Sequence, residues 1–257
     1  MIHVHPTAIV DPTAHLDDGV EIGPYCVIDG NVEIAAGVII DTHVRIMSGA
    51  RIGKNVRIHH GAVISNVPQD LKFKNEDSVS VIGANTIIRE FCTIHRGTSA
   101  TGKTVVGDNC FLMAYVHVAH DCVVGNNVIL ANAVNLGGHV HIEDFAIIGG
   151  MVPVHQFVRI GCHTMIGGGY RVAKDVPPYI LAAGEPLEYG GLNSVGLRRR
   201  GFSASTIRAL KEAYKLIYKS NLNVSQGLEK IRENGNIVPE VTKVIEFIEK
   251  SERGIIG

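Results

Sequence analysis

Residues 116–142, VHVAHDCVVGNNVILANAVNLGGHVHI, decide the fold. An aliphatic residue returns at every sixth position of this stretch: Val118, Val124, Leu130, Leu136 and Ile142. The position two residues earlier is again small or aliphatic: Val116, Cys122, Val128, Val134 and Val140. Neither the 3.6-residue period of a helix nor the simple alternation of a half-buried strand produces this pattern. Two inward residues in every six are typical of the hexapeptide repeat of a parallel β-helix.

The six-residue period extends over most of the chain. Steps of six from Val10 to Val172 cover 28 positions, and 25 of these hold Val, Ile or Leu. Three hexads form one triangular coil, and successive coils stack at the strand spacing of about 4.8 Å. Residues three hexads apart therefore lie directly above one another wherever the repeat is uninterrupted.

Two segments lack the inward pattern and are predicted to leave the β-helix as loops: SNVPQDLKFKNEDSVS at residues 65–80 and HRGTSATGKT at residues 95–104. The hexads end near residue 186. Helical spacing follows, with Ser203 and Asn223 as expected N-caps and Pro239 in the first turn of a last helix. We expect an all-β parallel β-helix over residues 1–186 and a small α-helical domain over residues 187–257.

The composition narrows the class of protein. A formal charge of −1 argues against nucleic-acid binding. The five cysteines form no CxxC motif, which fits a reducing cytoplasm. Four of them occupy the small inward position of a hexad: Cys26, Cys92, Cys110 and Cys122. The first residues do not resemble a signal peptide, and no apolar run reaches the ~18 residues of a membrane span. We expect a cytoplasmic protein without a transmembrane segment.

Four histidines converge on one edge of the predicted prism. Counted in coils of three hexads, one strip outside the inward positions holds His117, His120, His139, His155 and Gln156. Gly138 lies one coil above His120. Three interpretations are open at this point. The strip faces solvent or a partner subunit, or it forms a zinc site of the kind found in β-helical carbonic anhydrases, or it performs acid–base chemistry. In the last case His120 is the base and Asp121 holds its tautomer.

The ordered motifs of the chain resemble those of the UDP-N-acetylglucosamine acyltransferase family: HVAHDC, GGHV, IIGGM, VHQF, PQDLK, TIHRGT, DVPPY and GLNSVGLRRRGFS. The resemblance covers essentially the whole chain. It implies a left-handed coil and a homotrimer with active sites between neighbouring subunits. It also implies transfer of a (R)-3-hydroxyacyl chain from acyl carrier protein to the 3-position of the glucosamine of UDP-N-acetylglucosamine, the first step of lipid A biosynthesis. No cofactor or metal is expected.

The resemblance further implies roles for single residues. His120 matches the general base, Asp121 the residue that supports it, and the Gly138 N–H a donor to the oxyanion. Asp70 and Lys72 match contacts to the glucosamine. The remaining matches are the cleft residues His117, His139, His155 and Gln156, and the uridine and diphosphate contacts Asn193, Arg199 and Arg200.

Some positions depart from the family pattern. Val195 stands where some members carry an acidic residue. Tyr170 and Arg171 lie near the end of the β-helix, where members set acyl length; they shorten the acyl groove, or Tyr170 caps the narrowing core. Alternative functions are those of the lipid A N-acyltransferase, an acetyl-CoA-dependent sugar acetyltransferase and a γ-type carbonic anhydrase relative. Either a hydroxyl or an amine at the acceptor 3-position is compatible with these residues.

Overall fold

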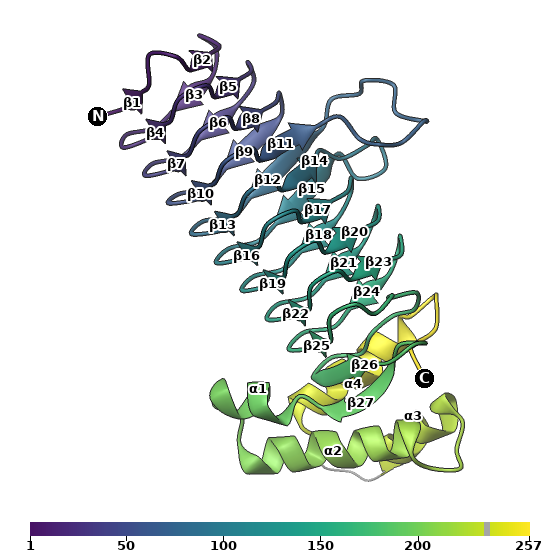
Figure 1. Cartoon of the computed structure of the whole chain (residues 1–257). Coiled ribbons are helices and arrows are strands. Elements are labelled where there is room, and N and C mark those ends of the chain that lie inside the picture. Colours follow the sequence, from purple (N-terminus) through teal and green to yellow (C-terminus); the bar gives the residue numbers. More distant parts are fainter. Residues whose placement is uncertain (234–236) are drawn as a thin grey trace.

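The chain folds into a tall stack of triangular coils with helices packed at one end (Figure 1). The computed structural model describes residues 1–233 and 237–257. The N-terminus lies at the open end of the stack, and the helices cover the other end (Figure 1). All strands within the coils pair in parallel with the strand one coil away. The predicted parallel β-helix is confirmed.

Three sheets form the walls of the prism, here called sheets A, B and C. Sheet A has, in spatial order, β1 (His3–Val4), β4 (Glu21–Ile22), β7 (Ile39–Ile40), β10 (Arg57–Ile58), β13 (Ile87–Ile88), β16 (Phe111–Leu112), β19 (Ile129–Leu130), β22 (Ile147–Ile148), β25 (Met165–Ile166), β26 (Ile180–Ala183) and β27 (Glu188–Leu192). Sheet B has β2 (Ile9–Val10), β5 (Val27–Ile28), β8 (Arg45–Ile46), β11 (Val63–Asn66), β14 (Thr93–His95), β17 (His117–Val118), β20 (Asn135–Leu136) and β23 (Pro153–Val154). Sheet C has β3 (His15–Leu16), β6 (Glu33–Ile34), β9 (Ala50–Ile52), β12 (Val79–Ile82), β15 (Lys103–Val106), β18 (Val123–Val124), β21 (His141–Ile142) and β24 (Arg159–Ile160).

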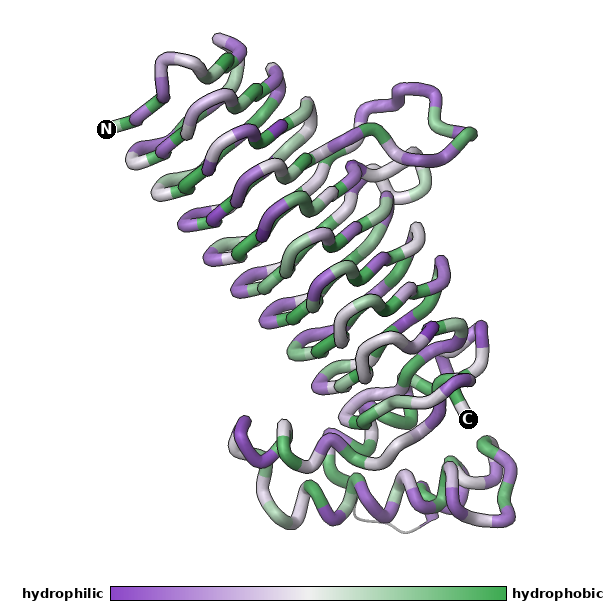
Figure 2. Tube along the Cα trace, in the orientation of Figure 1, coloured by the Kyte–Doolittle hydropathy of each residue, from purple (hydrophilic) through white to green (hydrophobic). Residues whose placement is uncertain are grey.

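The inward positions of the hexads build the core. The second residue of nearly every two-residue strand is an aliphatic side chain turned inward, and Ile28, Ile46 and Ile64 are at most 1% exposed. Apolar and polar segments consequently alternate along the coil (Figure 2). All five cysteines are buried and free. Burial raises the pKa of the Cys122 thiol to about 12, so it stays protonated despite its place beside the histidines.

Most corners of the prism turn through one residue in the left-handed backbone region. Asparagine or glycine often takes this position, because both tolerate a positive φ. At the edge between sheets B and C, called the B–C edge, the chain instead places Asp121, His139 and Phe157 there, with φ of 60°, 60° and 65°. The side chains of these residues therefore leave the turn outward, away from the core.

Both predicted loops leave the B–C edge, and both are shorter than expected. Strand β11 ends at Asn66 and β12 begins at Val79, on either side of the first loop. Strand β14 ends at His95 and β15 begins at Lys103, on either side of the second loop. The loops are therefore residues 67–78 and 96–102. The strands are longer because the flanking residues still pair with a neighbouring coil, as Val79 does with Lys103.

The C-terminal part closes the stack. Strand β26 pairs in parallel with β25, and β27 returns antiparallel to it, so the sheet continues past residue 186 into the segment expected to be helical. The described helices are α1 (Ser194–Arg199), α2 (Ala204–Tyr218), α3 (Val224–Glu233) and α4 (Pro239–Glu249). Ser203 and Asn223 accept backbone N–H groups as N-caps, and Pro239 opens α4, as predicted. None of these helices combines the length and the apolar character that crossing a membrane requires.

Candidate active site

The centre of the histidine strip is a hydrogen-bonded His–Asp pair on the B–C edge. His120 follows β17, and its Nδ1 lies 2.8 Å from Oδ2 of Asp121. The Asp121 side chain is fully buried and that of His120 is 13% exposed. Because a carboxylate only accepts hydrogen bonds, Nδ1 of His120 carries the proton. The Nε2 lone pair is therefore free to take a proton from a bound substrate.

The second loop holds the carboxylate in place. Thr98 donates to Asp121 through its backbone N–H at 3.0 Å and its hydroxyl at 2.7 Å, and the Thr101 hydroxyl donates to Oδ1. The Asp121 N–H donates to Oγ1 of Thr104 at 2.8 Å. Burial alone would raise the pKa of Asp121, but the hydrogen bonds from Thr101, His120 and Thr98 lower it to about 2. Asp121 is therefore charged at neutral pH.

Gly138 lies against the imidazole from one coil above. A Cβ built on Gly138 would lie 2.7 Å from Cε1 and 2.8 Å from Nε2 of His120, so only glycine leaves room for the ring. The Gly138 carbonyl accepts from the Phe157 N–H at 3.1 Å. Its own N–H has no hydrogen-bond partner among the described residues.

His139 and His117 lie beside this pair, and His155 lies on the next coil. The His139 ring is perpendicular to His120 at 5.2 Å and stacks on Phe157 at 4.5 Å. Nδ1 of His117 lies 2.8 Å from Oγ1 of Thr93. Burial, and then the nearby His120, lower the pKa of His117, which favours its neutral form. On the next coil, Nδ1 of His155 lies 3.0 Å from the Gln156 carbonyl oxygen. The structure thus places four of the five predicted strip residues, His120, His139, His155 and Gln156, on the B–C edge, and His117 beside them on β17 of sheet B.

The zinc interpretation fits this geometry poorly. Among the described residues, one group brings its potential ligand atoms within 4.8 Å of one another: His120, Asp121 and His139. A zinc ion there would have to displace the threonine donors from the Asp121 carboxylate. The two further histidines of the strip do not join the group. The hydrogen-bonded pair is compatible with the acid–base interpretation.

Sequence reasoning missed the residues beneath this pair. The loop HRGTSATGKT contains threonines at every third position, Thr98, Thr101 and Thr104, and this spacing was the available signal. His95, at its start, is 2% exposed, and its ring packs edge-on against His117 at 5.0 Å. Burial, and then His117, lower the pKa of His95 to about 4, so it is neutral.

Asp70 and Lys72 lie in the first loop, on the same edge. Oδ1 of Asp70 accepts the Lys72 N–H at 2.9 Å. The two loops pack together, since Glu76 accepts the Ser99 N–H at 3.1 Å. A hollow of about 740 Å³ between them is lined by Leu71, Lys72, Lys74, Glu76 and Ser99. Both predicted glucosamine contacts thus project from the edge that carries His120.

The predicted nucleotide contacts lie on a different edge. Asn193 donates to the backbone oxygens of Tyr179 and His163, at 2.8 and 2.9 Å. The Arg200 guanidinium lies over the Phe145 ring at 5.0 Å. These partners are turn residues between sheets C and A, called the C–A edge. Helix α1, with Arg199 at its end, lies on the opposite side of the stack from the two loops (Figure 1). One chain does not bring Asn193, Arg199 and Arg200 to His120.

Two departures from the family pattern are also located. Tyr170 packs against the end of the core, with its ring close to Gly167, which is compatible with a cap on the narrowing prism. Arg171 and Val195 are exposed, Val195 to 57%.

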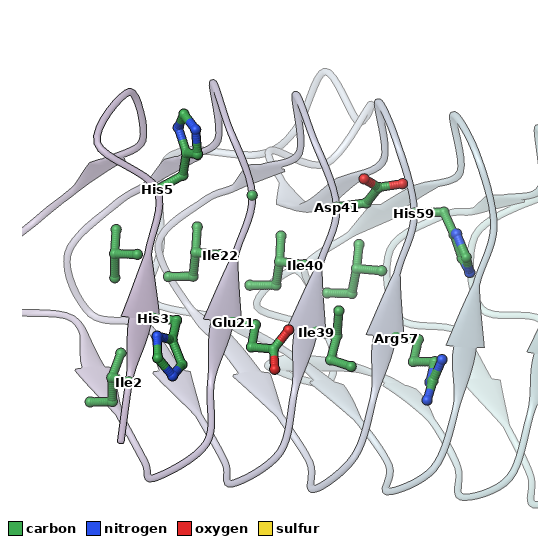
Figure 3. A pocket seen from close by; sticks show the side chains of 13 residues that line it. Ile2, His3, His5, Glu21, Ile22, Ile39, Ile40, Asp41, Arg57 and His59 are labelled. Carbon is green, nitrogen blue, oxygen red and sulfur yellow. The ribbon is translucent and has the colours of Figure 1, made fainter.

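A separate hollow of about 630 Å³ lies on sheet A near the N-terminus (Figure 3). Outward side chains of successive coils line it in two rows: His3, Glu21, Ile39 and Arg57 in one, His5, Asp41 and His59 in the other. These rows are on a wall of the prism and not on the edge that carries the histidine strip.

A hexapeptide β-helix that carries a hydrogen-bonded His–Asp pair on one edge is typical of the acyltransferases of the hexapeptide-repeat class. Comparison with known proteins makes the assignment specific. Residues 175–256 match the family model described as "Udp N-acetylglucosamine O-acyltransferase; Domain 2", and residues 31–66 and 103–138 match the bacterial transferase hexapeptide model.

The relatives agree over their whole length. The acyl-[acyl-carrier-protein]–UDP-N-acetylglucosamine O-acyltransferase of Paraburkholderia phymatum is 48% identical over all of both chains, and that of Thermodesulfovibrio yellowstonii is 48% identical over 99% of each. The crystal structure of the UDP-N-acetylglucosamine acyltransferase of Bacteroides fragilis superposes with a TM-score of 0.97 at 47% identity, covering 99% of this chain and 100% of that one. The chain belongs to the UDP-N-acetylglucosamine acyltransferase family, and its fold is the left-handed parallel β-helix of that family.

Proposed function

We propose that the chain transfers a (R)-3-hydroxyacyl group from acyl carrier protein to the 3-hydroxyl of UDP-N-acetylglucosamine, the first step of lipid A biosynthesis, with His120 as general base. The observation that carries the role of His120 is its geometry: Nδ1 is bound to a buried carboxylate, and Gly138 of the next coil lies against the imidazole, with an N–H that has no partner among the described residues. The two relatives from Paraburkholderia phymatum and Thermodesulfovibrio yellowstonii are named as O-acyltransferases, which supports a hydroxyl rather than an amine as acceptor.

The residues perform the transfer without a covalent enzyme intermediate. Nε2 of His120 removes the proton of the sugar 3-hydroxyl while that oxygen attacks the thioester carbonyl. The charge that develops on the carbonyl oxygen is stabilised by the Gly138 N–H, an interaction typically worth about 3 kcal/mol. When the tetrahedral intermediate collapses, the carrier thiolate leaves and takes the proton back from His120. Asp121 stabilises the imidazolium between these steps.

The site is completed by a second copy of the chain in a homotrimer. The proposed nucleotide contacts lie on the C–A edge and the base lies on the B–C edge, so one bound ligand reaches both only if two copies meet. A row of outward apolar side chains on sheet A offers an interface: Ile87, Phe111, Ile129, Ile147 and Met165 stack coil upon coil. The cytoplasm is the proposed location, where the five free cysteines are kept reduced.

A His120→Ala variant tests the base. We expect the rate of acyl transfer to fall by about 10²- to 10⁴-fold. The product formed from UDP-N-acetylglucosamine and acylated carrier protein is measured by mass spectrometry. Folding is expected to persist because the side chain faces outward. His15→Ala is the matched control, since His15 also pairs with an aspartate, at 3.1 Å, but lies on the exposed first coil. Turnover near that of the unmodified enzyme in His120→Ala would refute the proposed base.

Co-expression of two inactive variants tests the shared site. His120→Ala and Arg200→Ala disable different edges of the same chain. If neighbouring copies share each site, mixed trimers contain some sites with both residues intact and regain part of the activity. Mixed trimers that stay inactive, or a monomer by light scattering, would exclude the arrangement.

A further inference from the structure

The carboxylate of Asp121 accepts as many hydrogen bonds as its two oxygens allow. Its Oδ1 accepts the Thr98 N–H and the Thr101 hydroxyl, and its Oδ2 accepts the Thr98 hydroxyl and His120 Nδ1. A carboxylate offers about four lone-pair sites, so every site is used. Nε2 of His139 remains at 3.8 Å from Oδ2, beyond hydrogen-bond distance.

Three of these four hydrogen bonds come from loop 96–102, which no step of the reaction uses. The Thr98 hydroxyl is buried and also accepts the Ala100 N–H at 3.2 Å, so its single proton is directed to the carboxylate. The Thr101 hydroxyl lies near both Asp121 and the Lys103 carbonyl oxygen, at 2.9 Å from the latter. A hydroxyl has one proton, and the charged oxygen is the stronger acceptor.

We propose that Thr98 and Thr101 are positioning residues of the transfer reaction, because they share the negative charge of Asp121 and so limit how firmly it holds the proton of His120. This inference rests on the proposed role of His120 as the base. Without these hydroxyls, the carboxylate has fewer donors and binds the imidazole proton more strongly. His120 then stays protonated, and inactive as a base, up to a higher pH.

The other charged or titratable groups around His120 are few. His139 faces it from the next coil, and His117 and His95 lie on β17 and β14. All three are histidines, and burial lowers the pKa of His117 and His95, which favours the neutral form of both. Substituting Thr98 or Thr101 therefore removes a hydrogen bond to Asp121 and leaves the three histidines unchanged.

The test is the pH profile of kcat/KM for Thr98→Val, Thr101→Val and the double variant. We expect the acid limb to move upward by about half a pH unit or more in each single variant, and further in the double variant. One pH unit below the midpoint of the unmodified enzyme, a shift of half a unit lowers the rate about threefold, while the high-pH plateau is largely kept. Thr98→Ser and Thr101→Ser keep the hydroxyl and are expected to restore the original midpoint.

Thr13→Val is the matched control. Thr13 donates its N–H and its hydroxyl to Asp11, at 2.8 and 2.6 Å, as Thr98 does to Asp121, but on the first coil. If Thr98→Val fails to fold, Thr101→Val still decides the question, because Thr101 is exposed. An unmoved midpoint, or a loss that is uniform across pH, would overturn the inference. His120→Ala separates the two proposals: if that variant is inactive while the midpoints do not move, the base is right and the role of the threonines is wrong.

Discussion

Replacing Gly138 by alanine is expected to disable the base without unfolding the chain. The new Cβ would lie 2.7 Å from Cε1 and 2.8 Å from Nε2 of His120, whereas ordinary carbon contacts begin near about 3.4 Å. The ring must therefore retreat by roughly 0.7 Å. It cannot do so freely, because Nδ1 is tied to Asp121 at 2.8 Å. A misplacement of about 1 Å at a reacting group costs about 100-fold in rate, so we expect a loss of about 30- to 100-fold, or about 2–3 kcal/mol in the barrier.

The assay is acyl transfer at saturating donor, with a urea unfolding curve for each variant. The Gly138 N–H is retained, so the loss would report the position of the imidazole and not the oxyanion contact. Gly30→Ala is the control, because Gly30 holds the same turn position on an early coil and its Cβ would meet Oγ1 of Thr13 at 2.6 Å. Full activity of Gly138→Ala, or an equal loss in Gly30→Ala, would show that crowding of His120 is not the cause.

Three further outcomes are expected. Asp121→Asn keeps the shape of the side chain but removes the charge that supports the imidazolium, so transfer should fall by about 10²- to 10⁴-fold in the same assay. The pKa of Asp121 is lowered from 3.8 to about 2, so its contribution to stability is present above about pH 4 and is lost as the pH falls through about 2. The difference in urea midpoint between the unmodified chain and Asp121→Asn should therefore shrink as the pH falls from about 4 to about 2. Tyr214→Phe removes a buried hydroxyl that donates to the Pro178 carbonyl oxygen at 2.5 Å, and should cost about 1–2 kcal/mol in unfolding free energy by urea titration.

The repeat predicts the parts of the site that lie within it. Three hexads separate His120 from Gly138, so their stacking follows from counting, and the structure brings them into contact. His139 is displaced by one further residue and lies beside the same ring. Such inferences succeed because each coil is a copy of the one below it, and outward positions inherit the register of the buried isoleucines and valines.

Residues outside the repeat were not predictable in this way. Thr98 and Thr101 reach Asp121 only because their loop folds back over the B–C edge and packs on the first loop through Glu76 and Ser99. No period connects a loop residue to its partner. Likewise, the six-residue period cannot be followed past the antiparallel turn into β27. The position of Asn193 on the C–A edge is set by its hydrogen bond to His163, which the sequence pattern does not predict.

The hairpin of β26 and β27 has a consequence for solubility. A β-helix ends in open strand edges, and a stack of identical coils could in principle add another molecule end to end and grow into a fibre. Here the last strand, β27, runs antiparallel to β26. Near the C-terminus of the chain, Ile255 forms a parallel bridge with Asp175. An incoming coil of parallel hexads finds no matching rung at this end. Growth would have to proceed from the N-terminal rungs, whose two-residue strands present little backbone for pairing.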